Sequence, residues 1–193
     1  MEIKRKGSVK AYINLIYYPV KVLGPGERVG LWFQGCTIRC KGCMSKHTWE
    51  FEEKYLMDVE EVISTINSYP THRLTISGGE PFDQPEALLE ILKGVRETKR
   101  DILLYTGYTY EKVKKQWSDI LEFIDVLVVG PFIEGKETDA FWKGSENQEL
   151  IFLNESLKQE YSEFITAKKN KELQLVKKGN SIYLLGIPYQ RDW

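Results

Sequence analysis

Short apolar runs and amphipathic stretches alternate along the central part of the chain. The runs at residues 30–34, 73–77, 101–105 and 125–129 have the length and composition of strands. The last of them, DVLVV, is almost entirely apolar, which is typical of a strand inside a parallel sheet that is covered on both faces. We therefore expect a sheet whose strands are largely buried.

Between these runs, apolar residues recur with the spacing of an α-helix. One helix is predicted from Asp58 to about Tyr69, and a second follows Asp83. Both begin with D-x-x-E, the form of a capping box, so we expect the side chains of Asp58 and Asp83 to cap them. A third, shorter amphipathic helix is predicted within residues 110–117.

The order of these elements predicts an α/β fold. Strands and helices that alternate with short connections form right-handed βαβ units, and so few units fit an incomplete β/α barrel better than a closed one. The pattern changes after residue 153, where a polar helix-like stretch (155–169) precedes two apolar segments joined by a turn at 177–180. We expect residues 1–153 to form the core domain. Residues 154–193 would form a C-terminal extension that packs on this domain and ends in a β-hairpin.

Composition and charge narrow the classes of function. The chain has 193 residues, and 27 Lys and Arg against 28 Asp and Glu give a net charge of 27 − 28 = −1, which argues against a nucleic-acid partner. No apolar stretch approaches the ~18 residues of a membrane span. The basic start of the chain leads into a short apolar segment, but Asn14 and Pro19 interrupt it and no signal-peptide cleavage site follows. We expect a soluble, cytoplasmic protein without a membrane partner.

All three cysteines of the chain lie in one short segment, as Cys36, Cys40 and Cys43. Pairing two of them would leave one free and strain the loop, so a disulfide framework is a poor interpretation. Three thiolates at C-x3-C-x2-C can bind a 4Fe-4S cluster and leave one iron open to a substrate. His47 would instead complete a Cys3His zinc site. The spacing alone leaves both interpretations open.

Further motifs accompany the cysteines along the chain. They are Gly24-Pro25-Gly26-Glu27-Arg28, Thr48-Trp49, Ser77-Gly78-Gly79-Glu80-Pro81, Thr106-Gly107-Tyr108, residues 125–130 and Gly144-Ser145-Glu146-Asn147-Gln148. With these motifs, the three-cysteine loop resembles the signature of radical S-adenosylmethionine (SAM) enzymes. Over about residues 15–153, the chain most resembles the small activating proteins of anaerobic ribonucleoside-triphosphate reductase. The resemblance implies an incomplete (partial) β/α barrel of the radical SAM type.

The resemblance also implies which residues hold the cofactors. The three cysteines would hold a 4Fe-4S cluster, and the amine and carboxylate of SAM would bind its open iron. The glycines of the S-G-G-E-P motif would allow the close approach of backbone to SAM. The expected SAM contacts are Gly42, Met44, Ser77, Gly78, Gly79, Glu80, Thr106 and Asn147.

The reaction that the resemblance implies needs no protein general base, so no catalytic side chain is assigned. The reduced cluster would cleave SAM to methionine and a 5′-deoxyadenosyl radical. That radical would take a hydrogen atom from a backbone glycine of a large glycyl radical enzyme, expected to be anaerobic ribonucleotide reductase. A flavodoxin or ferredoxin would supply the electron.

Two alternatives follow from features of the chain. The family often has Asp at the position of Val129, and the C-terminal extension lies beyond the minimal family core. Both differences are compatible with a radical SAM enzyme that acts on a small molecule or peptide. The second alternative is a zinc-stabilised binding module with His47 as the fourth ligand.

Overall fold

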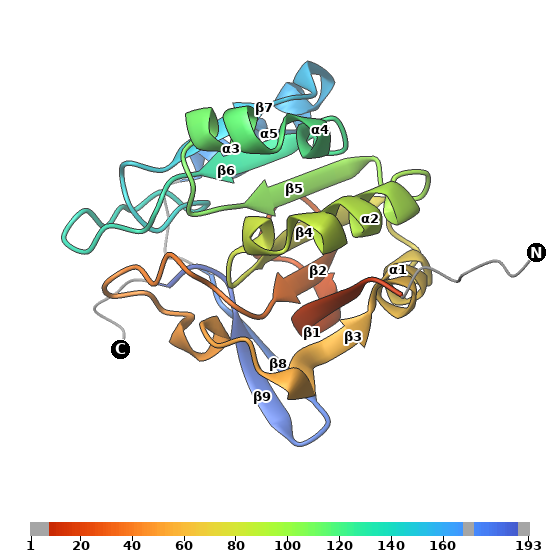
Figure 1. Cartoon of the computed structure of the whole chain (residues 1–193). Helices are drawn as coiled ribbons and strands as arrows, with labels where there is room; N and C mark the ends of the chain where they lie inside the picture. Colours follow the sequence, from red (N-terminus) through yellow and green to blue (C-terminus); the bar gives the residue numbers. More distant parts are fainter. Residues whose placement is uncertain (1–7, 168–171, 189–193) are drawn as a thin grey trace, which may run out of the picture.

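One mixed sheet dominates the computed structural model, which describes residues 8–167 and 172–188 (Figure 1). Its strand order is β3-β1-β2-β4-β5-β6-β7, and a separate two-stranded hairpin pairs β8 with β9. The strands are β1 (Lys10–Val20), β2 (Arg28–Phe33), β3 (Leu56–Asp58), β4 (Arg73–Gly78), β5 (Asp101–Tyr105), β6 (Val126–Val129), β7 (Glu149–Phe152), β8 (Gln174–Lys178) and β9 (Ser181–Leu185).

Helices connect the central strands. The α-helices are α1 (Val59–Asn67), α2 (Pro85–Val95), α3 (Tyr110–Gln116), α4 (Ser118–Leu121) and α5 (Lys158–Thr166), with short 3-10 turns at Lys46–Thr48, Glu53–Tyr55, Pro81–Asp83 and Glu155–Leu157. None of the helices in the described residues is both long and apolar enough to cross a membrane.

The centre of the sheet is parallel. Strands β2, β4, β5 and β6 run in one direction, while β1, β3 and β7 pair antiparallel at the two sides. The α/β prediction and the four predicted strands are confirmed. The sequence pattern did not predict β1, β3 or β7. Strand β1 is long and rich in tyrosine, and two register irregularities interrupt its pairing with β2, so its apolar residues do not follow a simple alternation.

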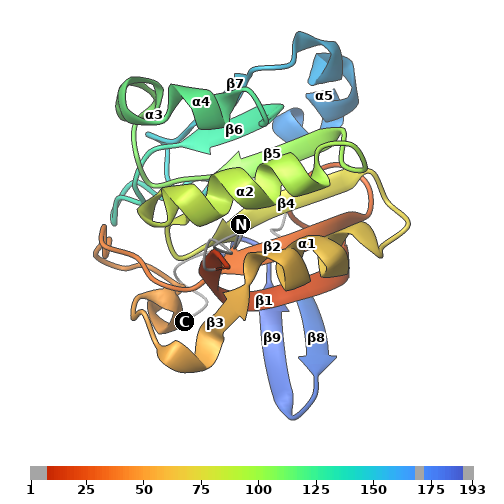
Figure 2. The same ribbon diagram turned by 45° about the vertical axis from the view of Figure 1, so that its right-hand side comes forward.

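Each face of the sheet is covered by different elements (Figure 2). Helices α1 to α4 pack on one face and form the main core with the outward side chains of β2, β4, β5 and β6. On the opposite face, α5 packs against β5 and β6, and the β8–β9 hairpin packs against β1. This second face is therefore covered at both sides by residues that follow Asn154. The predicted basic N-terminus and the predicted helix 155–169 include residues that lie outside the described ones, namely 1–7 and 168–169.

The two predicted capping boxes are wrong, although both helices form where expected. Asp58 precedes α1 but makes no capping bond to it; its carboxylate accepts a hydrogen bond from the Ser8 hydroxyl at 2.7 Å. Helix α2 begins at Pro85 after Gln84, and Asp83 belongs to the preceding turn. The D-x-x-E pattern marks both helix starts, but each aspartate binds a more distant partner instead.

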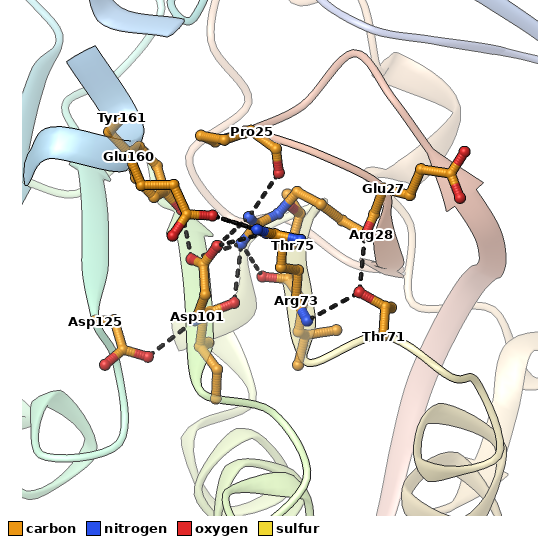
Figure 3. A network of polar contacts seen from close by, with 12 residues as sticks. Pro25, Glu27, Arg28, Thr71, Arg73, Thr75, Asp101, Asp125, Glu160 and Tyr161 are labelled. Carbon is orange, nitrogen blue, oxygen red and sulfur yellow. Dashed lines mark hydrogen bonds and ion pairs between the residues drawn. The ribbon is translucent and has the colours of Figure 1, made fainter. Parts of the chain in front are cut away.

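A buried arginine joins three adjacent strands at the end of the sheet where the parallel strands begin (Figure 3). The guanidinium of Arg28 on β2 donates to both carboxylate oxygens of Asp101 on β5, and its Nε donates to the Thr75 hydroxyl on β4 at 2.7 Å. The hydroxyl of Tyr161 on α5 donates to the same carboxylate at 2.6 Å. Arg73 adds an ion pair with Glu160 of α5. This network therefore attaches α5 to the sheet.

Removing the charge of Asp101 is expected to destabilise the protein strongly. Asp101→Asn leaves Arg28 fully buried without a counter-charge, a change that typically costs about 3–5 kcal/mol. The free energy of unfolding, measured by urea denaturation without oxygen, should fall by about that amount. The control is Glu90→Gln in the exposed Glu90–Lys93 pair, which should cost less than about 0.5 kcal/mol. A loss below about 1 kcal/mol in Asp101→Asn would contradict this structural role.

Candidate functional site

The carboxyl ends of the parallel strands open into one cavity of about 230 Å³. The cysteine loop after β2 and the loop between β6 and β7 lie at this same end of the sheet, on the left of Figure 1. The cavity is lined by all three cysteines, by the S-G-G-E segment at the end of β4, by Thr106 and Gly107 after β5, and by Gly130 and Gln148. Ligand sites of open α/β folds lie at this end of the strands.

The cysteine loop is held in place by its backbone. The N–H of Gly35 donates to the carbonyl of Thr48 at 2.7 Å, and the N–H of Cys36 donates to the carbonyl of Trp49 at 2.9 Å. Three residues of the loop have a positive φ: Gly35 (98°), Arg39 (50°) and Gly42 (73°). These left-handed turns fold the loop compactly, and all three cysteines line the cavity.

The thiols are partly buried. Burial raises the pKa of the Cys36 and Cys40 thiols above the usual range, although backbone hydrogen bonds offset part of this effect. Both thiols are therefore largely protonated at neutral pH in the absence of a metal. A bound metal would displace these protons, because the thiolate is the form that ligates metals.

Asp83 fastens the cysteine loop to the rest of the site. Its carboxylate accepts hydrogen bonds from the backbone N–H of Thr37 at 2.6 Å and from the Thr37 hydroxyl at 3.0 Å. The hydroxyl of Tyr108 donates to the same carboxylate at 2.6 Å. Burial and the Asp83 contact raise the pKa of Tyr108 to about 12, so Tyr108 remains a donor at neutral pH. Sequence reasoning missed this role of Asp83, because both partners are remote along the chain.

Glu80 joins the ends of three strands. Its backbone N–H donates to the carbonyl of Gly35 at 2.8 Å. Its carboxylate, 1% exposed, accepts from the Thr106 hydroxyl and the Gly107 N–H, both at 2.8 Å, and from the Phe82 N–H at 3.0 Å. Burial raises the pKa of Glu80 to about 7, and these hydrogen bonds partly offset that effect. The carboxylate therefore positions the loops around the cavity.

Two glycines permit close packing beneath the cysteine loop. A Cβ on Gly79 would lie 2.1 Å from the carbonyl oxygen of Gly35, and a Cβ on Gly107 would lie 2.7 Å from the side chain of Ile38. The first contact is with a backbone oxygen, which cannot move aside as the end of a flexible side chain can. The segment after β4 can therefore lie against the cysteine loop only with glycine at position 79.

The structure brings most of the expected site residues to this cavity. The expected residues that line it are Cys36, Cys40, Cys43, Met44, Ser77, Gly78, Gly79, Glu80 and Thr106. Gly42 and Asn147 are not among the lining residues; the Asn147 amide donates to the carbonyl of Pro131, and the neighbouring Gln148 lines the cavity instead.

Two other residues singled out in the sequence also lie away from the cavity lining. His47, the fourth ligand of the zinc interpretation, is exposed in the turn after the cysteine loop. The side chain of Val129 is buried in the core between the sheet and the helices, while the next residue, Gly130, reaches the cavity.

Several lining residues were not expected, among them Leu23, Trp32, Tyr105 and residues 186–188. The alternation of side chains along β2 is the signal for Trp32, because Leu31 and Phe33 on its two sides point into the helix-covered core, and Leu104 before Tyr105 does the same on β5. For residues 186–188, which follow the hairpin, the sequence holds no comparable signal.

The donor chemistry of the cavity fits an iron–sulfur cluster with a polar ligand beside it. Three thiols line it, and two lining residues carry a buried polar atom without a partner among the described residues, namely the Trp49 indole nitrogen and the Tyr105 hydroxyl. Within the same residues, no three His, Cys, Asp or Glu side chains are placed to hold one metal ion. Thiols that bind different irons of a cluster need not converge on one point.

Comparison with known proteins identifies the family. The family model described as a 4Fe-4S single cluster domain matches residues 22–151. The anaerobic ribonucleoside-triphosphate reductase-activating protein of Haemophilus influenzae is 37% identical over 145 residues, covering 69% of this chain and 94% of its own length. The proteins of that name from Vibrio cholerae (36%; 68% and 92% covered) and Enterobacteria phage T4 (33%; 67% and 86% covered) are similar. The chain belongs to this family.

Membership of this family establishes the class of enzyme and its cofactors. The protein is a radical SAM enzyme with a 4Fe-4S cluster and SAM as cofactors. Among solved structures, QueE from Escherichia coli matches 52% of this chain and 53% of its own, with 22% identity and a TM-score of 0.44, which is too low to support a conclusion.

Removing the Asp83 carboxylate is expected to loosen the cysteine loop without affecting α2. Asp83→Ala removes charge-assisted hydrogen bonds of about 1.5–3 kcal/mol each, so hydrogen exchange at the Thr37 amide should accelerate at least about tenfold. Glu86→Ala, in the exposed first turn of α2, is the matched control and should leave Thr37 unchanged. Faster exchange in the first turn of α2, with Thr37 unaffected, would instead show that Asp83 caps that helix.

Proposed function

We propose that this protein activates an anaerobic ribonucleoside-triphosphate reductase by forming a glycyl radical on it. The observation that carries the proposal is that all three cysteines share one cavity with the S-G-G-E segment and Thr106, in a chain of the activating-protein family. In this proposal, Cys36, Cys40 and Cys43 would hold a 4Fe-4S cluster through three of its irons, and the open iron would be left for SAM.

The residues around the cysteines have a proposed role in binding SAM. The backbone of Ser77, Gly78 and Gly79 receives its amino end, and Met44 lies beside its adenine. Glu80 and Thr106, hydrogen-bonded to each other at 2.8 Å, hold this surface in place. Gly42 and Asn147 contribute through the shape of their loops, since neither lines the cavity.

When bound, the two cofactors supply the electron and the 5′-deoxyadenosyl radical. The C–H bond of the target glycine breaks, a C–H bond of 5′-deoxyadenosine forms, and the unpaired electron remains on the glycine. A flavodoxin or ferredoxin is the proposed electron donor. The protein itself orients the reactants and excludes water, and it transfers no proton through a side chain.

The proposed architecture is a partial β/α barrel of the radical SAM type. Residues 1–153 form its core domain, and residues 154–193 form an extension that packs on the same domain. The packing of Tyr161 and Phe164 against β5 and β6, and of Val176 and Leu185 against β1, supports this division. Residues 174–185, which form β8, the turn and β9, are the hairpin of the extension. We propose that the protein works in the cytoplasm, where thiols stay reduced.

The zinc-module alternative has no comparable support. Its fourth ligand, His47, is outside the cavity that the cysteines line. A small-molecule or peptide substrate was suggested by Val129 and by the C-terminal extension. The Val129 side chain is buried in the core and is not among the residues that line the cavity. The extension packs on the sheet through α5 and the β8–β9 hairpin. The reductase therefore remains the proposed target.

The proposed function is tested by electron paramagnetic resonance. Cluster-loaded protein, SAM, a reductant and the anaerobic reductase of the same organism are mixed without oxygen. A glycyl radical signal that depends on SAM and on this protein supports the proposal. Formation of 5′-deoxyadenosine without any glycyl radical would mean that the reductase is not the target.

Loss of one cysteine is expected to abolish the chemistry. Cys40→Ala removes one proposed ligand, so iron content and 5′-deoxyadenosine formation should both fall, the latter by more than about 100-fold, since the cluster supplies the electron. Lys41→Ala is the matched control in the same loop, because this side chain is 87% exposed and pairs with Glu134 on the surface. Cleavage of SAM at the normal rate by Cys40→Ala would refute the ligand assignment.

A further inference from the structure

The cavity lining includes apolar and aromatic residues that the proposed cofactor contacts do not use. They are Leu23, Trp32 at the end of β2, Tyr105 at the end of β5 and residues 186–188, which follow β9. We call residues 186–188 the strap. Ile187 of the strap belongs to the same apolar cluster as Leu23 and Trp32, so the three side chains form one wall.

The strap reaches the cavity through a glycine turn. Gly186 has φ +119°, and a Cβ there would lie 2.8 Å from the carbonyl oxygen of Glu172, so only glycine fits this turn without strain. The chain thus leaves β9 and runs directly into the cavity wall. The strap lies beyond residues 22–151, which the family model matches.

The hairpin fixes the strap against the sheet. Its Gln174 side chain accepts from the N–H of Lys21 at 3.0 Å and donates to the carbonyl of Pro19 at 2.8 Å. The ammonium of Lys178 donates to the carbonyl of Ile16 at 3.1 Å. Val176 of β8 and Leu185 of β9 are buried where the hairpin packs against β1. The strap is therefore anchored by a packed element.

The side chains of this wall select against a charged occupant. Leu23, Trp32 and Ile187 carry no charge. Tyr105 also lines the cavity, and burial keeps its hydroxyl protonated by raising its pKa. The methionine part of SAM carries a sulfonium, an amine and a carboxylate, and burying these against apolar side chains would be costly. The uncharged adenine of SAM is assigned to the surface beside Met44. A target glycine, by contrast, is uncharged and has no side chain.

We propose that the strap completes a binding site for the polypeptide segment that carries the target glycine, with Ile187 in contact with that segment. The proposal rests on the proposed function, since it identifies which part of the cavity receives the target. The strap would then determine which segment the enzyme accepts, and SAM would bind in the part of the cavity near the cysteines.

The test uses two substitutions of Ile187 in the full-length, cluster-loaded protein. Ile187→Trp fills the site, and the KM for the reductase, measured from initial rates of glycyl radical formation, should rise at least about tenfold. Ile187→Ala removes only part of the contact and should raise this KM about 3- to 10-fold. This smaller side chain also keeps the test valid if Ile187→Trp does not fold. The dissociation constant of SAM, measured by equilibrium dialysis, should change less than about twofold in either variant.

The matched controls are Ile182→Trp and Ile182→Ala on the same hairpin, where the side chain is 68% exposed and does not line the cavity. They should leave both constants unchanged. If the Ile187 variants weaken SAM binding instead, the apolar wall belongs to the cofactor and the proposal is wrong. Unchanged constants in both Ile187 variants also overturn it. Absence of a glycyl radical with the unmodified protein would be a failure of the proposed function, which is a different result.

Discussion

The buried carboxylate of Glu80 determines how the three strand ends meet. Its two oxygens bind the Thr106 hydroxyl and the Gly107 N–H after β5, while its backbone N–H binds the carbonyl of Gly35 after β2. A group with 1% exposure lies in a low-dielectric environment, where each of these hydrogen bonds is strengthened and an unpaired acceptor would be costly. The protein's own hydrogen bonds therefore join the cysteine loop, the S-G-G-E segment and the Thr106 turn. This connection lets thiols from one loop and backbone from another line the same cavity.

The end of the sheet where the parallel strands begin and the end where they finish differ in structure and in role. At the end where the parallel strands begin, the Arg28–Asp101 pair and Tyr161 connect β2, β4, β5 and α5 in a fully buried network (Figure 3). At the opposite end, the strands finish in glycine-rich loops with positive φ angles and partly buried thiols. The rigid end holds the spacing of the strands, so the loops at the other end can adopt the conformations that the site requires. The motif Gly24 to Arg28 belongs to the rigid end, apart from the cofactor site.

Local sequence patterns predicted the elements whose formation depends on residues close together along the chain. The apolar runs of β4, β5 and β6 are buried on both faces, which their composition already indicates. The resemblance to radical SAM enzymes predicted that the three cysteines and the S-G-G-E motif share one site, and the structure brings them to one cavity because parallel strands end at the same edge. Asp83 was misjudged as a helix cap, since its partners Thr37 and Tyr108 are 46 and 25 positions away along the chain. The strap was missed because its contact with Leu23 and Trp32 depends on how the hairpin folds back over the sheet.

Metal content is the most direct test of the central claim that one cavity holds a cluster with an open iron. The protein is purified without oxygen, and iron, sulfide and zinc are measured per chain. We expect about four irons and four sulfides with no zinc, because three thiols line the cavity and His47 does not. One zinc per chain, with no iron retained even after reconstitution with iron and sulfide, would contradict the account and identify the cysteines as a structural zinc site.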